Sequence, residues 1–245
     1  MAADLIPHLW QVPQVFRDRM GEHVGRQRLM ASDGHLLFVL HAVPEPNENQ
    51  RHGRFFWRDP EGQWTSADRG TGTHALNKHL DEYEELIAAL DHLEEQATTS
   101  SEYFAILERL SPVRRAATNL YHVLQQAREE CPDLRELINF RDRAYEIERT
   151  AELLLTEVKN SLDVAVAKRA EEQAVTSHRM SVSAHRLNML AAFFFPIATL
   201  MAIFGANLRH GWEDTWPPFP MLVVLGFGLA LGGILTVFMT RAASS

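Results

Sequence analysis

Two long uncharged apolar segments near the C-terminal end constrain this chain more than any other feature. Residues 187–204 read LNMLAAFFFPIATLMAIF, of which fifteen of eighteen are apolar, and residues 219–239 read FPMLVVLGFGLALGGILTVFM. A helix needs about 20 mostly apolar residues to cross a bilayer, so both segments are predicted membrane spans. A pair of buried core helices is the alternative. Two such segments in succession, with Trp212 and Trp216 between them, disfavour it.

Basic residues beside the spans predict the orientation. Lys168, Arg169, Arg179 and Arg186 precede the first span, whereas the connecting segment holds only Arg209. Since positive residues stay on the cytoplasmic side, we expect a multi-pass inner (plasma) membrane protein with both termini in the cytoplasm. The expected organisation is a cytoplasmic α/β domain at 1–130, a cytoplasmic stalk helix at 131–186, spans at 187–204 and 219–240 around a periplasmic loop at 205–218, and a cytoplasmic tail at 241–245.

The charge balance and the cysteine content exclude several classes of protein. The chain has 24 Lys and Arg against 32 Asp and Glu, and residues 1–186 carry the whole net charge of −8. So acidic a chain is not expected to bind nucleic acid. Cys131 is the single cysteine, which excludes an intrachain disulfide and fits a cytosolic environment. The sequence has no P-loop, nucleophile motif or HExxH, so an enzyme is not expected.

The spacing of glycine and proline predicts one very long helix. No glycine occurs from 73 to 204, and Pro196 is the only proline between 133 and 204. An uninterrupted helix of that length measures on the order of 100 Å, and only about 30 Å of it fits a bilayer core. Its apolar stripe is expected to pack against other copies of the chain or, alternatively, against the preceding helices. The stripe contains Leu134, Leu137, Ile138, Tyr145, Ala151, Leu154, Leu155, Val158, Leu162 and Val166.

The first 72 residues read as β-rich. Residues 26–31 and 35–43 flank Ser32-Asp33-Gly34, which predicts a hairpin with an Asp-Gly turn. Residues 54–58 and 63–65 predict a second, shorter hairpin, and 13–20 a short helix.

Helices are expected to take over at residue 73, over about 74–97 and 101–130, the second interrupted at Ser111-Pro112. The first of them is strongly acidic. Its carboxylates form either a solvated face or a low-affinity cation-sensing surface. They are Asp81, Glu82, Glu84, Glu85, Asp91, Glu94 and Glu95.

The end of the first span carries a family resemblance. It reads Ile203-Phe204-Gly205-Ala206-Asn207-Leu208, in which an aromatic residue precedes Gly-x-Asn at the outer end of a span that contains a proline. This pattern resembles the CorA-type divalent-cation transporters, whose signature is Gly-Met-Asn. The resemblance is specific over 181–240, architectural over 133–180 and weak over 1–130. It implies an α+β cytoplasmic domain, a very long stalk/TM1 helix and a second TM helix in a homopentamer, with the first span lining a central pore.

The resemblance also implies which residues select and conduct the ion. Gly205, Ala206 and Asn207 form the expected selectivity loop, in which a ring of Asn207 side chains holds a hydrated cation. Glu213 and Asp214 are an expected outer acidic ring or, alternatively, ordinary loop acids. The expected pore-lining residues follow three-to-four spacing, with Leu187 and Phe195 as apolar constrictions. They are Ser181, Ala184, Leu187, Asn188, Ala191, Phe195, Ala198 and Ala202.

The transported ion and two other functions stay open at this point. Alanine replaces the signature methionine, so Mg²⁺ and Zn²⁺, Co²⁺ or Ni²⁺ are all possible substrates. His178 and His185 are seven residues apart and are either zinc ligands or solvent-facing side chains. No covalent cofactor is expected, only a transported or regulatory divalent cation. The alternatives to a channel or transporter are a CorA-shaped membrane scaffold or metal sensor with little conductance, and a proton-coupled zinc transporter.

Overall fold

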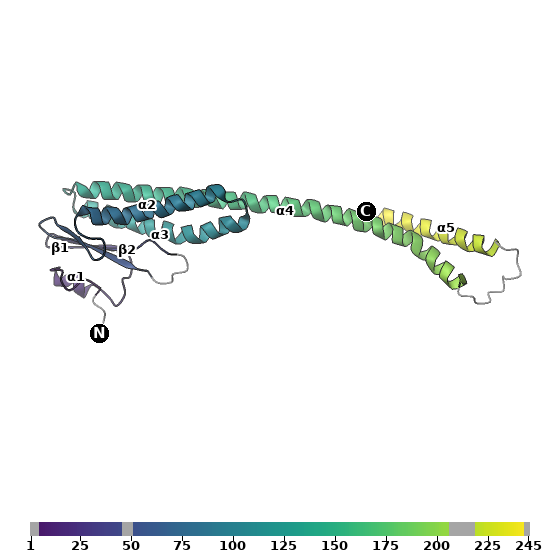
Figure 1. Cartoon of the computed structure of the whole chain (residues 1–245), viewed down its shortest axis with the longest axis horizontal. Coiled ribbons are helices and arrows are strands. Elements are labelled where there is room, and N and C mark those ends of the chain that lie inside the picture. Colours follow the sequence, from purple (N-terminus) through teal and green to yellow (C-terminus); the bar gives the residue numbers. More distant parts are fainter. Residues whose placement is uncertain (1–4, 46–50, 206–218, 243–245) are drawn as a thin grey trace. The chain divides into compact units, whose positions relative to one another are not determined.

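The computed structural model describes residues 5–45, 51–205 and 219–242 of the chain (Figure 1). Their backbone divides into two compact units, Met1–Ala167 and Lys168–Ser245. The first unit holds the sheet and the helices that cover it, and the second holds the apolar helices. The long helix α4 (Glu136–Gly205) contributes to both units.

The sheet of the first unit is an antiparallel meander with strand order β1-β2-β3-β4. Asp33 and Gly34 have φ angles of 50° and 78°, which suits the type I′ turn that follows the right-handed twist of a hairpin. The first two strands pair with each other and the last two do likewise, so both predicted hairpins are confirmed. The strands are β1 (Arg28–Ser32), β2 (His35–His41), β3 (Gly53–Arg58) and β4 (Trp64–Ser66).

Both faces of this sheet are covered. On one face, Phe38, Phe56 and Trp64 belong to the large core that the sheet shares with the helices. On the other face, the N-terminal segment packs Ile6 and, from helix α1 (Gln14–Asp18), Phe16 against Leu37, Val39 and Phe55. Burial on both sides explains why β2 reads as an unbroken apolar run rather than an alternating one.

Three helices form the other half of the first unit: α2 (Thr73–Gln96), α3 (Ser100–Glu130) and the beginning of α4. The predicted break between α2 and α3 is confirmed by a capping box at Thr99, whose side chain accepts from the Glu102 backbone N–H while the Glu102 carboxylate accepts from the backbone N–H of Thr99. The predicted interruption at Ser111-Pro112 is wrong, because α3 continues through it. Pro112 is exposed while Leu110 and Val113 are buried, so core packing on both sides keeps the turn helical despite the missing N–H.

The apolar stripe of α4 packs within its own chain over most of its length. The buried residues of α4 alternate three- and four-residue steps, as expected for one face of a helix. The second alternative for the stripe therefore applies up to Val158, whereas Tyr145 and Val166 are exposed in the single chain. The buried residues of α4 are Leu137, Phe140, Ala144, Ile147, Ala151, Leu154 and Val158.

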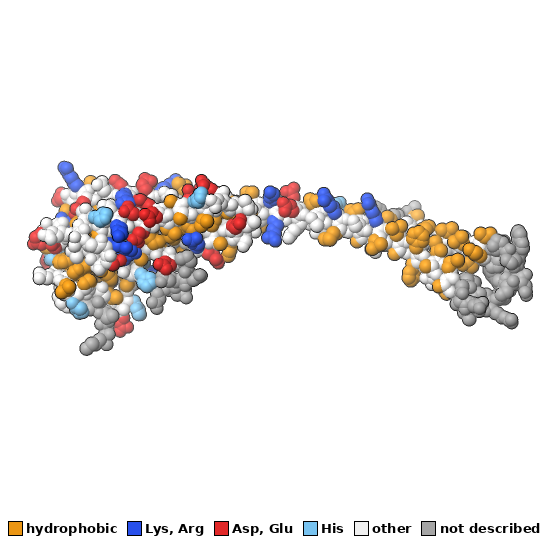
Figure 2. Space-filling model, in the orientation of Figure 1, with side chains coloured by type: hydrophobic (Ala, Val, Ile, Leu, Met, Phe, Trp, Pro, Cys, Tyr) orange, Lys and Arg blue, Asp and Glu red, His pale blue; other side chains and the backbone are white. Residues whose placement is uncertain are grey.

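The second unit contains the end of α4 and helix α5 (Phe219–Ala242). As predicted, α4 continues to Gly205 through Pro196 without a break. It includes an 18-residue window with mean hydropathy 1.6, long and apolar enough to cross a membrane, and the described part of α5 adds the shorter apolar helix Met221–Val237. Figure 2 shows hydrophobic side chains dominating the visible face of the apolar part of this unit, in contrast to the mixed charges of the first unit.

Candidate functional site

Two glycines of α5 allow it to approach α4 closely. A Cβ added to Gly232 would lie 2.6 Å from the Phe193 carbonyl oxygen, and one added to Gly228 would lie 3.2 Å from Ile197 Cγ1. Gly228 and Gly232 are four residues apart, the spacing at which small residues let membrane helices pack backbone to backbone. These two glycines therefore serve close packing of α5 against α4. Gly226 and Gly233 face open space among the described residues.

The predicted pore face of α4 lies on the side that α5 leaves uncovered. An α-helix turns by about 100° per residue, so Ala191, Phe195 and Ala198 point away from the side that meets Gly228 and Gly232. All of the predicted pore-lining residues are exposed in the single chain, and Phe195 is 71% exposed. The Thr199 hydroxyl, on the same stretch, donates to the Phe195 carbonyl oxygen at 2.8 Å. Among the residues that the structure describes nothing covers this face, and its role as a pore lining stays a prediction.

The predicted selectivity loop begins where α4 ends. Gly205 is the last residue of α4. Ala206 and Asn207 lie outside the described residues, as do Glu213 and Asp214.

The two predicted zinc-binding histidines are separate in one chain. His178 and His185 are both on α4, and seven residues correspond to about 10 Å along a helix. Within the described residues, no group of three or more His, Cys, Asp or Glu side chains is placed to hold a metal ion. The assignment of these two histidines as zinc ligands therefore stays a prediction.

Several carboxylates of the acidic helix α2 are engaged in ion pairs. Arg143 of α4 contacts Asp81 at 2.6 Å and Glu84 at 2.9 Å, and it also donates to Asn77 Oδ1 at 2.9 Å. These contacts hold α4 against α2. Burial acts to lower the pKa of Arg143, but the hydrogen bonds and negative charges of Asp81 and Glu84 together raise it.

A second cluster ties α2 to the sheet. Glu82 pairs with Arg54 of β3 and, at 2.8 Å, with Arg69. Arg54 also donates to His79 Nδ1 at 3.0 Å. Asp81, Glu82 and Glu84 therefore serve intramolecular contacts, which favours the structural interpretation of this helix over a cation-sensing surface.

His79 is a buried neutral histidine inside this cluster. Burial, reinforced by the positive charge of Arg54, lowers its pKa from 6.5 to about 3. Its ring lies against Phe56 and Tyr83, with centroids 5.4 Å from each. Its Nε2 has no hydrogen-bond partner in the part of the chain that the structure describes. Such a group stabilises the core when neutral and cannot act as a ligand reached from solvent.

The start of α4 is fixed to the sheet by one carboxylate. Glu136 Oε1 accepts from Arg58 Nε at 3.0 Å and from Trp64 Nε1 at 2.9 Å. These two bonds hold the first turn of α4 against β3 and β4.

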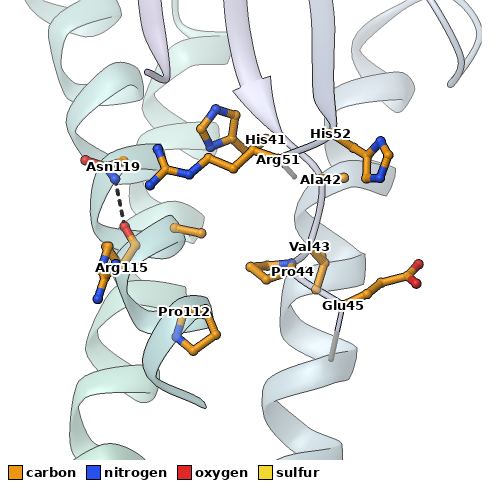
Figure 3. Close-up of a pocket in the computed structure, with 11 residues that line it drawn as sticks. His41, Ala42, Val43, Pro44, Glu45, Arg51, His52, Pro112, Arg115 and Asn119 are labelled. Atoms are coloured by element: carbon orange, nitrogen blue, oxygen red, sulfur yellow. Dashed lines mark hydrogen bonds between the residues drawn. The ribbon is translucent and has the colours of Figure 1, made fainter. Parts of the chain in front are cut away.

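A cavity of about 160 Å³ lies between the end of β2, the start of β3 and α3 (Figure 3). Its charged lining is mostly basic, with Arg51 and Arg115 against Glu45. Burial and the nearby Arg51 lower the pKa of His41, although its Nε2 is 2.9 Å from the Gly25 carbonyl oxygen. The net positive charge of its lining disfavours the binding of a cation in this cavity. Sequence reasoning missed it because its lining comes from segments far apart in the chain.

Comparison with known proteins supplies the family. Residues 72–241 match the model of the family described as CorA-like Mg2+ transporter protein. No curated protein matches. Among solved structures, the chain is similar to the full-length CmaX protein, with 13% identity and a TM-score of 0.51 over 93% of this chain and 80% of that chain. A second similarity is to the CorA magnesium transporter from Methanocaldococcus jannaschii, with 14% identity and a TM-score of 0.42 over 89% of this chain and 81% of that chain. The similarity to CmaX concerns the fold alone.

Proposed function

Since this chain belongs to the CorA-like Mg2+ transporter family, we propose that it assembles into a homopentamer that conducts divalent cations across the inner membrane. The observation that carries the proposal is the extent of the family match, which includes both apolar helices and the three-helix half of the first unit. In this arrangement the termini face the cytoplasm, in agreement with the basic residues before the first span.

The uncovered face of α4 supports a pore built around this helix. Small side chains at Ala184, Ala191, Ala198 and Ala202 allow several copies of the helix to converge on one axis. Larger apolar side chains on the same face narrow such a pore and gate it by excluding water. A pore of this kind needs no covalent chemistry and no nucleotide.

Selection of the ion is assigned to the loop that follows α4. A ring of Asn207 amide oxygens and neighbouring carbonyl groups is neutral and suits a cation that keeps its water shell, as Mg²⁺ does. Glu213 and Asp214 at the outer mouth raise the local concentration of cations.

Cation uptake into proteoliposomes tests this proposal. Purified full-length chain is reconstituted, and uptake of Mg²⁺, Zn²⁺, Co²⁺ and Ni²⁺ is followed with an internal indicator. We expect uptake of at least one ion by the wild type and a loss of at least tenfold for Asn207→Ala. The control is Asn160→Ala, which removes an exposed amide of α4 outside the spans.

Three outcomes decide between the interpretations. No uptake of any of the four ions by a folded oligomer supports the scaffold or sensor. Uptake of Zn²⁺ that depends on a pH gradient supports a proton-coupled zinc transporter. A dimeric mass in mild detergent contradicts the pore itself.

A further inference from the structure

A groove runs between α4 and α5 in the second unit, next to Arg186. It has a volume of about 430 Å³, within the range of small-molecule sites. Its lining is Arg186, Met189, Leu190 and Phe193 from α4 and Thr236 from α5. The Thr236 hydroxyl donates to the Gly232 carbonyl oxygen at 2.8 Å, so its hydrogen is already used. The surface of the groove is almost wholly apolar, and Arg186 contributes its aliphatic stem to it.

Arg186 places an unneutralised positive charge beside this groove, because its aliphatic stem lines the groove while the side chain as a whole is exposed. Its side chain is exposed and has no ion-pair or hydrogen-bond partner among the residues that the structure describes. Residues 173–205 and 219–242 contain no Asp or Glu, so neither helix supplies a counter-charge near it. A guanidinium in this setting has two vacant, parallel N–H donors that fit a phosphate.

The position of Arg186 relates the charge to the membrane. It immediately precedes the uncharged segment at 187–204. A long basic side chain at such a boundary reaches the level of the lipid headgroups while its stem lies along apolar surface. Met189, Leu190 and Phe193 follow on the next two turns, toward the middle of the span. Phe193 is the residue that Gly232 contacts, which places the groove on the side of α4 opposite the predicted pore face.

We propose that this groove binds an anionic phospholipid. The phosphate pairs with Arg186, and an acyl chain lies along Met189, Leu190 and Phe193. A basic side chain at the cytoplasmic boundary attracts such headgroups, because the inner leaflet is rich in anionic lipid. The proposal uses the membrane-spanning part of the proposed function and goes beyond it, since neither the loop after α4 nor conduction enters the argument.

Native mass spectrometry of the full-length chain in mild detergent tests the proposal. Phosphatidylglycerol, phosphatidylcholine and glycerol 3-phosphate are titrated separately, so that headgroup charge and acyl chains are varied independently. We expect phosphatidylglycerol to bind more tightly than phosphatidylcholine, and glycerol 3-phosphate not to be retained. Arg186→Gln should weaken phosphatidylglycerol about fivefold, the factor that corresponds to about 1 kcal/mol per basic residue near a membrane surface.

A matched control is Arg179→Gln, which removes an exposed arginine two turns earlier on α4 and outside the groove. It should change the affinity less than twofold. Thr236→Phe fills the groove and leaves Arg186 in place, so it should reduce retention of phosphatidylglycerol at least fivefold, and it decides the matter if Arg186→Gln does not fold.

The proposal is overturned by any of three results. These are equal binding of the two lipids, equal effects of Arg186→Gln and Arg179→Gln, or retention of glycerol 3-phosphate as strong as that of the lipid. The proposal also fails if the wild type binds no lipid and Thr236→Phe changes the oligomeric mass, because a second copy of the chain then occupies the groove. Because the measurement records lipid mass and not cation flux, its failure is distinct from failure of the transport proposal.

Discussion

Replacing Gly232 by alanine should separate the two apolar helices. The new Cβ would lie 2.6 Å from the Phe193 carbonyl oxygen and 3.4 Å from the Phe193 Cα. Ordinary contacts begin at 3.4 Å, so the two backbones must move apart by about 0.8 Å. Since the obstacle is the backbone of α4, no side-chain rotation relieves it.

The neighbouring glycine provides a matched control for the size of this effect. Gly233 has no described atom within 4 Å of an added Cβ, so Gly233→Ala makes no clash. Forcing extra volume into a packed contact costs about 1–3 kcal/mol. Alanine is favoured over glycine within a helix by roughly 0.5–1 kcal/mol, and both variants gain that amount. The difference between the two variants should therefore be about 2 kcal/mol in favour of Gly233→Ala.

Thermal unfolding of the full-length chain in detergent measures this difference. With about 2–4 °C of Tm per kcal/mol for a chain of this size, Gly232→Ala should melt roughly 4–8 °C below Gly233→Ala. Equal melting temperatures would refute the reasoning, because they would mean that α5 does not approach α4 at Gly232.

Two further predictions concern the first unit. The unfolded chain binds a proton at His79 below pH 6.5, whereas the folded chain does so only near pH 3, so stability is lost as pH falls through this window. Between pH 7.5 and 5, urea unfolding of the wild type should lose about 2 kcal/mol more than that of His79→Asn, which keeps an acceptor for Arg54 but does not titrate. The exposed control His92→Asn should behave as the wild type, and equal losses in all three proteins would contradict the burial argument. Glu136→Ala leaves the Trp64 indole N–H unpaired and should cost about 1–3 kcal/mol in the same assay. Glu146→Ala, at an exposed site on the same helix, should cost less than about 0.5 kcal/mol, and a similar cost for both would show that Glu136 does not anchor α4.

Local patterns in the sequence were sufficient for most of the elements. The predicted elements include the turn at Asp33-Gly34, the helix break near Thr99 and the long helix without glycine that ends at Gly205. Each depends on the backbone preferences of a few neighbouring residues, and each is found in the structure. The predicted interruption at Pro112 is wrong because packing with distant residues decides the structure there. Its local preference against a helix interior is outweighed by the buried Leu110 and Val113, whose partners are distant in sequence.

The role of the acidic residues of α2 could not be predicted from the sequence. Seven acidic residues on α2 suggest a surface for cations when only the sequence is considered. The structure pairs Asp81 and Glu84 with Arg143, which follows them by about sixty residues, and Glu82 with Arg54 and Arg69. Whether a charge is solvated or paired depends on which segments pack together.

By itself, the sequence determined that the chain has two uncharged apolar helices at its C-terminal end, one long helix leading into them and a Gly-x-Asn motif between them. These are properties of neighbouring residues, since hydropathy and helix continuity are set over a few turns. Only the tertiary structure decided which face of α4 meets Gly228 and Gly232, and therefore which face stays uncovered and where the groove at Arg186 lies. A helical face has the same composition whether a neighbour covers it or not, so the choice rests on the close approach of two backbones that are distant in sequence.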